Sequence, residues 1–476
     1  MLGIVDHDVV VIGAGAAGLA AARSARRKGS VALIEVDRPG GECTFTGCVP
    51  SKTLLELAHC VAAVSKADRA GVEATVRVDI SAVLTYVRSI VEEIATDESP
   101  ERLRSEGIDL IEGSASFIDD RRIEVGGKSI AARYFVVATG TRPAIPPIPG
   151  LKESDPLTNE TIFDIREAPS RLVVLGGGAV GCELAQGFAR LGVPVSLVEA
   201  ASRILGDEEP DASDVVAGAL SNDGIEVVVG AKVSAAEKGL LRLEDGRELR
   251  GSHVLVAAGR IPQVEGLALE RAGVELDEDG SIKIDARNRT TNARIYAVGD
   301  CASRLRFTHV ADEQGRTSIA DIYSRFPRKT DLGAIPWVTF TSPEVGRVGT
   351  TEAEAYEMYG DKARVAIMSI DKTDRGRISG HREGFVKLIG APHPVTRSIG
   401  GGRLVGMTAV CERGGELVAE GALAMRSGTL AGRLAQTVHA YPTWSIAVRQ
   451  AAAQWFTGLD RAARPSPGSG FRRSGS

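Results

Sequence analysis

Two closely spaced cysteines, Cys43 and Cys48, are the residues best suited to redox chemistry. They lie in the run GGECTFTGCVPSKTLLE, which predicts a helix after Cys48 with Pro50 in its first turn. A thiol at a helix N-terminus has a lowered pKa, because the partial positive charge there stabilises the thiolate. Lys52, one turn further on, adds a cation that stabilises electron-rich states. The spacing therefore favours reversible thiol and disulfide chemistry.

A structural zinc site is the alternative use of such a pair, and it needs two further ligands nearby. His59 and Cys60 lie about three helical turns beyond Cys48, too far to complete a compact tetrahedral site by local spacing. The remaining cysteines are scattered and are interpreted as small buried hydrophobic residues: Cys60, Cys182, Cys301 and Cys411. The pattern therefore predicts no metal site.

Two segments of the same design, about 160 residues apart, determine the architecture that positions these groups. Each predicts an apolar strand, a GxGxxG turn, a helix and a second strand that ends on a glutamate. The glycines let backbone amides and the helix N-terminus meet a pyrophosphate, and the acid accepts hydrogen bonds from an adenosine ribose. The residues are Gly13, Gly15, Gly18 and Glu35 in the first segment and Gly176, Gly178, Gly181 and Glu199 in the second.

Two dinucleotide sites in one chain predict two cofactors that exchange electrons, and FAD with a nicotinamide is the simplest pair. Glu199 would repel a 2′-phosphate and Ala200 offers no cation beside it, so NADH is favoured over NADPH. Arg203 is the cation that could instead turn toward a phosphate.

The chain has 476 residues, enough for roughly three domains. We expect an α/β fold with two Rossmann-like dinucleotide-binding domains and a C-terminal α+β domain. The Pro-rich run TRPAIPPIPG predicts a linker after the first domain. The expected boundaries are 1–150 and 271–333 for the two parts of the FAD-binding domain, 151–270 for the NAD(P)-binding domain, 334–458 for the third domain, and 459–476 for a disordered tail.

Composition narrows the class of function. Apolar residues make up 43% and charged residues 25%, as in soluble globular proteins. A net charge of −5 and 4% aromatic residues give no support to nucleic-acid binding. The sequence contains no uninterrupted run of about 18 apolar residues, so it predicts no membrane span. The N-terminus lacks a basic leader and cleavage site, so we expect a cytoplasmic protein.

The run GGECTFTGCVPSK resembles the active-site signature of class I pyridine nucleotide-disulfide oxidoreductases, the class of dihydrolipoamide dehydrogenase, glutathione reductase and mercuric reductase. The resemblance extends to about residue 458. It includes both Gly-rich turns, ATG at Ala138 to Gly140, AVGD at Ala297 to Asp300, FTHVADEQ, and WVTFTSPEVG in the last domain.

The resemblance implies roles for individual residues. Cys48 would face the flavin and Cys43 would be the interchange thiol that attacks the acceptor. Lys52 would lie near flavin N5 and pair with Glu183. The resemblance also implies a homodimer whose last domain completes the partner's active site. Further cofactor contacts would come from Gly41, Thr139, Gly140, Gly259, Asp300 at the ribityl chain, and His309 to Ala311 beside the isoalloxazine.

The resemblance breaks near the C-terminus. Dithiol-using relatives carry HPTxxE, whose histidine is an acid/base, whereas this chain reads HAYPTWSI, with Tyr441 and Ile446 at the histidine and glutamate positions. A tyrosine with a pKa of about 10 is a poor general base at neutral pH. His439, two residues earlier, is the alternative acid/base. Mercuric reductases also carry a tyrosine there, but this chain lacks their N-terminal CxxC domain and C-terminal cysteine pair.

The leading hypothesis is an oxidoreductase that passes electrons from NAD(P)H through FAD and the Cys43–Cys48 disulfide to a small acceptor. A metal ion, a quinone, a small electrophile or a disulfide fits an acceptor that needs little proton transfer. The alternatives are a dihydrolipoamide dehydrogenase that uses His439 as its base, and a non-catalytic flavin redox sensor.

Overall fold

The computed structural model describes residues 5–65, 67, 71–395 and 399–457, so the predicted tail 459–476 lies outside the described residues. The chain forms two compact units, residues 1–202 with 223–332 and residues 203–222 with 333–476. Across the described residues, no helix is both long and apolar enough to cross a membrane.

The first unit contains the sheet that the first Gly-rich segment predicts. Its strands run in the order β3-β2-β1-β6-β5-β4, and β16 pairs in parallel with β6. Apolar runs such as HDVVVI form strands buried on both faces, as parallel sheets require. The strands are β1 (His7–Ile12), β2 (Val31–Glu35), β3 (Asp109–Glu112), β4 (Ala115–Phe117), β5 (Arg122–Val125), β6 (Lys128–Val137) and β16 (Ile295–Ala297).

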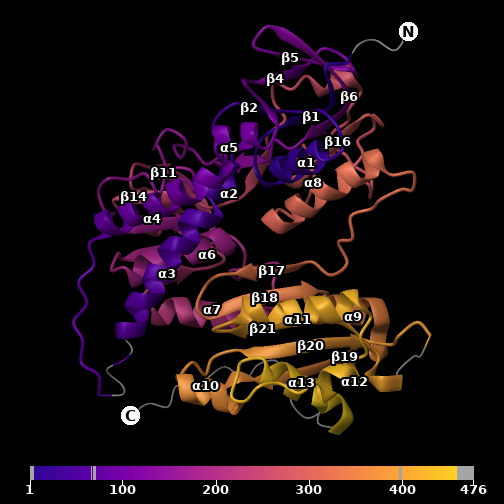
Figure 1. Cartoon of the computed structure of the whole chain (residues 1–476). Coiled ribbons are helices and arrows are strands. Elements are labelled where there is room, and N and C mark those ends of the chain that lie inside the picture. Colours follow the sequence, from indigo (N-terminus) through magenta and orange to yellow (C-terminus); the bar gives the residue numbers. More distant parts are fainter. Residues whose placement is uncertain (1–4, 66, 68–70, 396–398, 458–476) are drawn as a thin grey trace. The chain divides into compact units, whose positions relative to one another are not determined.

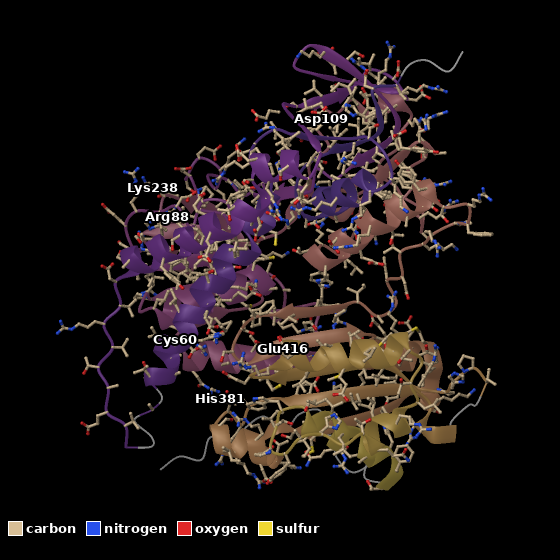
Figure 2. All side chains as sticks on the ribbon, viewed as in Figure 1. Cys60, Arg88, Asp109, Lys238, His381 and Glu416 are labelled. Carbon is tan, nitrogen blue, oxygen red and sulfur yellow. The ribbon has the colours of Figure 1, made fainter. Side chains whose placement is uncertain are left out.

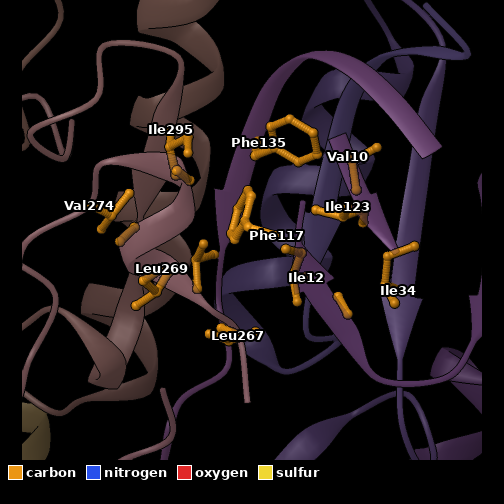
Figure 3. Close-up of a cluster of buried hydrophobic side chains, with 14 of the residues drawn as sticks. Val10, Ile12, Ile34, Phe117, Ile123, Phe135, Leu267, Leu269, Val274 and Ile295 are labelled. Atoms are coloured by element: carbon orange, nitrogen blue, oxygen red, sulfur yellow. The ribbon is translucent and has the colours of Figure 1, made fainter. Parts of the chain in front are cut away.

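Helices α1 (Ala16–Arg26) and α8 (Thr308–Tyr323) pack together over this sheet (Figure 1). A buried cluster that includes Val10, Phe117 and Phe135 forms part of its core (Figure 3). The other helices of this region are α2 (Gly41–Phe45), α3 (Cys48–Ser65), α4 (Ile80–Ala95), α5 (Pro100–Ser105) and the 3-10 turns η2 (Thr96–Glu98), η3 (Leu269–Ala272) and η4 (Gly299–Cys301).

A second parallel sheet, in the order β10-β9-β8-β14, follows from the second Gly-rich segment. Two short strands, β7 and β15, pair where the chain leaves the first sheet and returns to it. The elements are β7 (Thr141–Pro143), β8 (Leu172–Leu175), α6 (Ala179–Arg190), β9 (Val195–Val198), β10 (Glu226–Val228), β11 (Val233–Glu237), β12 (Leu240–Leu243), β13 (Glu248–Arg250), β14 (His253–Val256) and β15 (Arg260–Pro262).

The second unit is an antiparallel sheet, β17-β18-β21-β20-β19, with α11 against β18 and β21 and α13 against β19 and β20. The two units confirm the predicted α/β class with a C-terminal α+β part. The elements are α7 (Pro210–Asn222), β17 (Pro336–Thr339), β18 (Glu344–Gly349), α9 (Glu352–Tyr359), η5 (Gly360–Lys362), β19 (Arg364–Ser369), η6 (Ile370–Lys372), α10 (Asp374–Ser379), β20 (Phe385–Ala391), η7 (Ile399–Gly401), β21 (Arg403–Cys411), α11 (Gly414–Arg426), α12 (Ala431–Gln436) and α13 (Ile446–Thr457).

Residues 203–222 group with residues 333–476, whereas the predicted boundaries placed them in the NAD(P)-binding domain, 151–270. They pack with the C-terminal sheet because buried ion pairs hold them there. Arg347 Nε lies 2.8 Å from Glu208 Oε2, and Lys387 Nζ, in a side chain only 1% exposed, lies 3.2 Å from Glu209 Oε2. Buried charges of this kind need their partners, so the segment belongs energetically to the second unit.

Candidate functional site

The two cysteines lie on consecutive helices, Cys43 on α2 and Cys48 at the first residue of α3. The predicted helix start at Cys48 is therefore confirmed. Both are thiols, and Cys48 is exposed while Cys43 is half-buried. Thr308, the first residue of α8, places its hydroxyl oxygen 3.4 Å from each sulfur. Three helices thus meet at the thiol pair.

The two thiols are electrostatically unequal. The pKa of Cys48 is lowered to about 6, chiefly by a hydrogen bond from Cys43, which together with smaller contributions from Thr308 and Lys52 outweighs the effect of partial desolvation. The same hydrogen bond, together with burial, raises the pKa of Cys43. Cys48 is therefore the thiolate at neutral pH and Cys43 the protonated donor.

Replacing Thr308 by valine is expected to raise the pKa of Cys48 in the reduced protein. A hydrogen bond to a charged group contributes about 1.5 kcal/mol or more, which corresponds to about one pKa unit. The thiolate would then be lost at a higher pH. A pH titration of the thiolate absorbance of the reduced dithiol protein measures this, with Thr308→Ser as the control that retains the hydroxyl. An unchanged titration in the valine variant would show that Thr308 does not stabilise the thiolate.

Lys52 and Glu183 form the ion pair that the resemblance implies. Lys52 Nζ lies 2.7 Å from Glu183 Oε2, and the two side chains are 35% and 5% exposed. Lys52 is on α3, one turn after Cys48, and Glu183 is on α6, in the first two turns after the second Gly-rich turn. The pair therefore joins the thiol helix to the second dinucleotide segment.

The two glutamates predicted to bind ribose occupy matching places: Glu35 is the last residue of β2, and Glu199 directly follows the last residue of β9. Glu35 Oε2 accepts a hydrogen bond from the Ala14 amide at 2.6 Å, and Glu199 Oε2 accepts one from the Gly177 amide at the same distance. Each glutamate thus also holds the Gly-rich turn in place. The other oxygen, Oε1, accepts from the Val36 and Asp37 amides in Glu35 and from the Ala201 amide in Glu199, so both carboxylates are held in a fixed orientation.

The Gly-rich turns fit a dinucleotide pyrophosphate. A Cβ on Gly18 would lie 1.8 Å from the Gly13 oxygen, and one on Gly181 would lie 1.9 Å from the Gly176 oxygen, so only glycine lets each helix approach its turn. Within the described residues, no side chain caps α1 at Gly15 or α6 at Gly178. The first-turn amides of both helices are thus oriented to bind an anion.

Gly41 belongs to the first of these sites, because a Cβ on it would lie 2.7 Å from the Gly15 Cα. Gly140 and Gly259 have φ of +68° and +133°, a backbone region that favours glycine. Thr139 donates a hydrogen bond to the Gln263 oxygen at 2.6 Å. Gly140 follows β6 of the first sheet and Gly259 follows β14 of the second, so each lies where the chain passes between the two sheets.

Asp300 lies in a half-buried polar cluster. Burial raises its pKa, and Arg260, Arg306 and a hydrogen bond from Thr141 oppose that shift. Arg306 Nε is buried with no hydrogen-bond partner among the described residues. Such a cluster suits a polar ligand such as the ribityl chain implied for Asp300. Nearby on α8, the His309 ring stacks on Phe307 with centroids 5.6 Å apart, and Ala311 is buried.

Tyr441 and His439 lie in the second unit. The Tyr441 hydroxyl donates to Asp374 Oδ2 at 2.8 Å, and this hydrogen bond raises the pKa of Tyr441. The His439 side chain is only 6% exposed, and its Nε2 lies 3.0 Å from Glu420 Oε1. Its Nδ1 lies 3.0 Å from the Thr437 carbonyl oxygen. Both ring nitrogens of His439 therefore lie within hydrogen-bonding distance of an acceptor oxygen.

Several site residues were missed by reasoning from the sequence. Thr308 immediately precedes the predicted His309, and its place at the start of a helix was the available signal. Glu42, adjacent to Cys43, accepts hydrogen bonds from Arg260 and Asn159. Cys60, labelled in Figure 2, is exposed on α3, so the prediction that it is a small buried residue is wrong: it lies on a solvent-facing side of the helix. The same prediction is confirmed for the buried residues Cys182, Cys301 and Cys411. Across the described residues, no group of three or more histidine, cysteine or acidic side chains is arranged to hold a metal ion.

The sequence profiles of two protein families match this chain. Residues 7–315 match "Pyridine nucleotide-disulphide oxidoreductase", and residues 335–452 match the dimerisation domain of the same family.

Among the individual relatives, some are named mercuric reductases and others dihydrolipoyl dehydrogenases. The chain is 34% identical to a mercuric reductase of Streptomyces lividans over 466 residues, covering 95% of this chain and 96% of the relative. It is 33% identical to a dihydrolipoyl dehydrogenase of Haloferax volcanii, covering 94% and 95%. Among solved structures, the HOCl-induced flavoprotein disulfide reductase RclA from Escherichia coli is similar, with a TM-score of 0.83, 27% identity, and coverage of 94% and 99%.

Proposed function

Because this chain belongs to the pyridine nucleotide-disulphide oxidoreductase family, we propose that it passes electrons from NADH through FAD and the Cys43–Cys48 pair to a small acceptor. The observation that carries the proposal is the unequal thiol pair, in which Thr308 hydrogen-bonds both sulfurs and the pKa of Cys48 is lowered to about 6. A low pKa at one thiol and a high pKa at the other is the arrangement that reversible disulfide chemistry uses.

In this proposal the first Gly-rich turn, Glu35 and Asp300 hold FAD, and the second turn with Glu199 holds the nicotinamide cofactor. Bound FAD supplies a two-electron carrier between the nicotinamide and the disulfide. Lys52, fixed by Glu183, holds a positive charge beside the thiol helix, where it stabilises negative charge.

The thiol chemistry balances with one proton. Two electrons break the S–S bond, Cys48 remains a thiolate, and Cys43 takes up one proton. When the acceptor is reduced, the S–S bond forms again, two electrons leave and Cys43 releases its proton. The hydroxyl of Thr308, 3.4 Å from each sulfur, is placed to hydrogen-bond with either thiol.

The acceptor is proposed to need little proton transfer: a metal ion, a quinone, a small electrophile or a reactive disulfide. Tyr441 occupies the place of the family histidine, and its hydroxyl is already donated to Asp374. His439 is buried between two acceptors, which weighs against the dihydrolipoamide dehydrogenase alternative. Relatives of this chain include mercuric reductases, and RclA has been solved as a Cu(II) complex. Both findings support the proposal that a metal ion is the acceptor, so metal ions should be tested first.

The match to the family's dimerisation domain supports a homodimer. Within the second unit, Leu423 and Val438 are large apolar residues that are 70% and 87% exposed, as expected of a surface that a second copy covers.

An anaerobic titration of the FAD-loaded protein with NADH tests the proposal. We expect four electrons per chain to be taken up in total, a long-wavelength thiolate absorption after the first two, and two newly alkylatable thiols. A panel of Hg(II), Cu(II), quinones and lipoamide then identifies the acceptor. Absence of the thiolate absorption with both cysteines intact would refute the electron route. Fast lipoamide turnover would favour the dehydrogenase, and reduction without turnover on any acceptor would favour the redox sensor.

NADH is expected to be used at least about tenfold better than NADPH, judged by kcat/KM. Glu199 Oε2 accepts from Gly177 and its Oε1 from Ala201, so the carboxylate stays where a 2′-phosphate would meet it. Glu199→Gln removes the negative charge but retains one oxygen that can accept from a backbone amide. The ratio of kcat/KM for NADH to kcat/KM for NADPH should therefore fall. Steady-state rates with both cofactors measure it, with Glu35→Gln as the control at the matching position of the other site. A wild-type preference for NADPH would contradict this assignment.

A further inference from the structure

Helix α2, which carries Cys43, is a single turn of five residues, Gly41–Phe45. A helix this short has no stability of its own in water. Its place relative to α3 must therefore be decided by contacts from outside the helix. Because a disulfide forms only when the two Cα atoms lie within about 7 Å, those contacts also decide how readily Cys43 reaches Cys48.

Asn159 contacts both ends of α2. Its amide nitrogen lies 2.8 Å from Glu42 Oε1, near the start of the helix, and 3.3 Å from the Thr46 carbonyl oxygen, just after its end. Asn159 follows the linker into the second dinucleotide segment, more than 100 residues away from α2 in sequence. The Asn159 side chain therefore connects the two ends of α2 through hydrogen bonds.

Arg260 holds the other oxygen of Glu42. Its Nη2 donates to Glu42 Oε2, and its Nε donates to the Thr141 hydroxyl at 2.7 Å. Both Arg260 and Thr141 lie on the paired strands β15 and β7, so the arginine is fixed by the sheet from which it extends. The Arg260 and Glu42 side chains are 20% and 31% exposed, so this ion pair is partly shielded from water. Burial raises the pKa of Glu42, and Arg260 is the largest opposing influence.

We propose that Glu42, Asn159 and Arg260 form a clasp that positions Cys43 for disulfide formation and thereby sets the reduction potential of the Cys43–Cys48 couple. The inference rests on the proposed function, because it concerns the same thiol pair. The reaction it controls is the oxidation of one thiol and one thiolate to a disulfide, which releases two electrons and one proton. The clasp raises the effective concentration of one sulfur at the other. These three are positioning residues and take no part in the electron transfer itself.

The test is the midpoint potential of the thiol couple in the FAD-loaded protein, measured by equilibration with defined mixtures of reduced and oxidised dithiothreitol followed by thiol alkylation and mass analysis. Glu42→Ala is expected to weaken the disulfide relative to the dithiol about tenfold, which moves the potential about 30 mV more positive. Asn159→Ala removes both contacts to α2 without a change in charge and is expected to move the potential in the same direction. It also keeps the inference testable if the Glu42 variant fails to fold.

The matched control is Glu265→Gln. Glu265 pairs with Arg142 on the same two-stranded ladder at 3.1 Å but does not contact α2, so its loss should leave the thiol potential unchanged. The midpoint potential of FAD is recorded in every variant. A shift of the FAD potential with an unchanged thiol potential would overturn the clasp, as would unchanged thiol potentials in both alanine variants. If the wild-type pair itself does not form a disulfide, the proposed function fails and the clasp fails with it.

Discussion

Replacing Cys43 by serine is expected to lower turnover by about a thousandfold or more with any acceptor that the dithiol reduces, while NADH still reduces bound FAD. Cys48 alone cannot form the intramolecular disulfide, and it is the formation of this disulfide that releases the two electrons to the acceptor. Stopped-flow reduction by NADH and steady-state acceptor turnover separate the two half-reactions. A variant that retained full turnover would show that the acceptor is reduced without the thiol pair.

The same variant should display the thiolate of Cys48 beside the cofactor without added reductant. That signal is present above the pKa of Cys48 and is lost as the pH falls through it. In the reduced wild-type protein the transition is expected near the lowered pKa of about 6. In Cys43→Ser the introduced hydroxyl, Thr308 and Lys52 still lower the pKa, so the transition should stay below that of an ordinary thiol. Cys60→Ser, which changes an exposed cysteine on α3, is the control and should alter neither signal nor rate.

Replacing Lys52 by methionine is expected to slow reduction of FAD by NADH about a hundredfold and to destabilise the protein. The Glu183 side chain, 5% exposed, would lose its ion-pair partner, and the loss of one member of a buried ion pair costs on the order of 3 kcal/mol. The positive charge beside the thiol helix would be lost at the same time, and each 1.4 kcal/mol of barrier is about a tenfold change in rate. Stopped-flow kinetics measure the rate and chemical denaturation measures the free energy of unfolding.

A second buried ion pair on α6 separates these two effects. Arg190 Nε lies 2.8 Å from Asp223 Oδ2, with side chains 4% and 12% exposed. Asp223→Asn should therefore lower the free energy of unfolding while leaving reduction of FAD unchanged. In Lys52→Met combined with Glu183→Leu, stability should recover while the rate stays low. A recovered rate in that double variant would mean that Lys52 acts only as a structural partner of Glu183.

The parts of the site that the sequence predicted depend on local sterics and short spacing. Gly13 and Gly18 are predictable because a side chain at either would block the approach of helix, turn and pyrophosphate. The start of α3 at Cys48 follows from a proline placed two residues later. The pairing of Lys52 with Glu183, 131 positions apart, came only from the family resemblance.

The contacts that distinguish the two thiols were decided by tertiary structure. Thr308 lies 260 residues from Cys48 and reaches it only because α8 packs beside α1 and points its first residue at α3. The hydrogen bond of Glu42 to Arg260 spans 218 positions and depends on how β15 pairs with β7. No period or spacing in a linear sequence encodes such approaches.

The C-terminal residues show the same division. The sequence alone identified Tyr441 and Ile446 at the positions of the family's histidine and glutamate, because that comparison needs only residue types in order. It left His439 as an alternative acid/base. The fold buries that ring between Glu420 and the Thr437 carbonyl, one on α11 and one just after α12. Residue identity is thus local information, whereas the availability of a nitrogen or a thiol for chemistry depends on the acceptors and donors that distant segments bring to it.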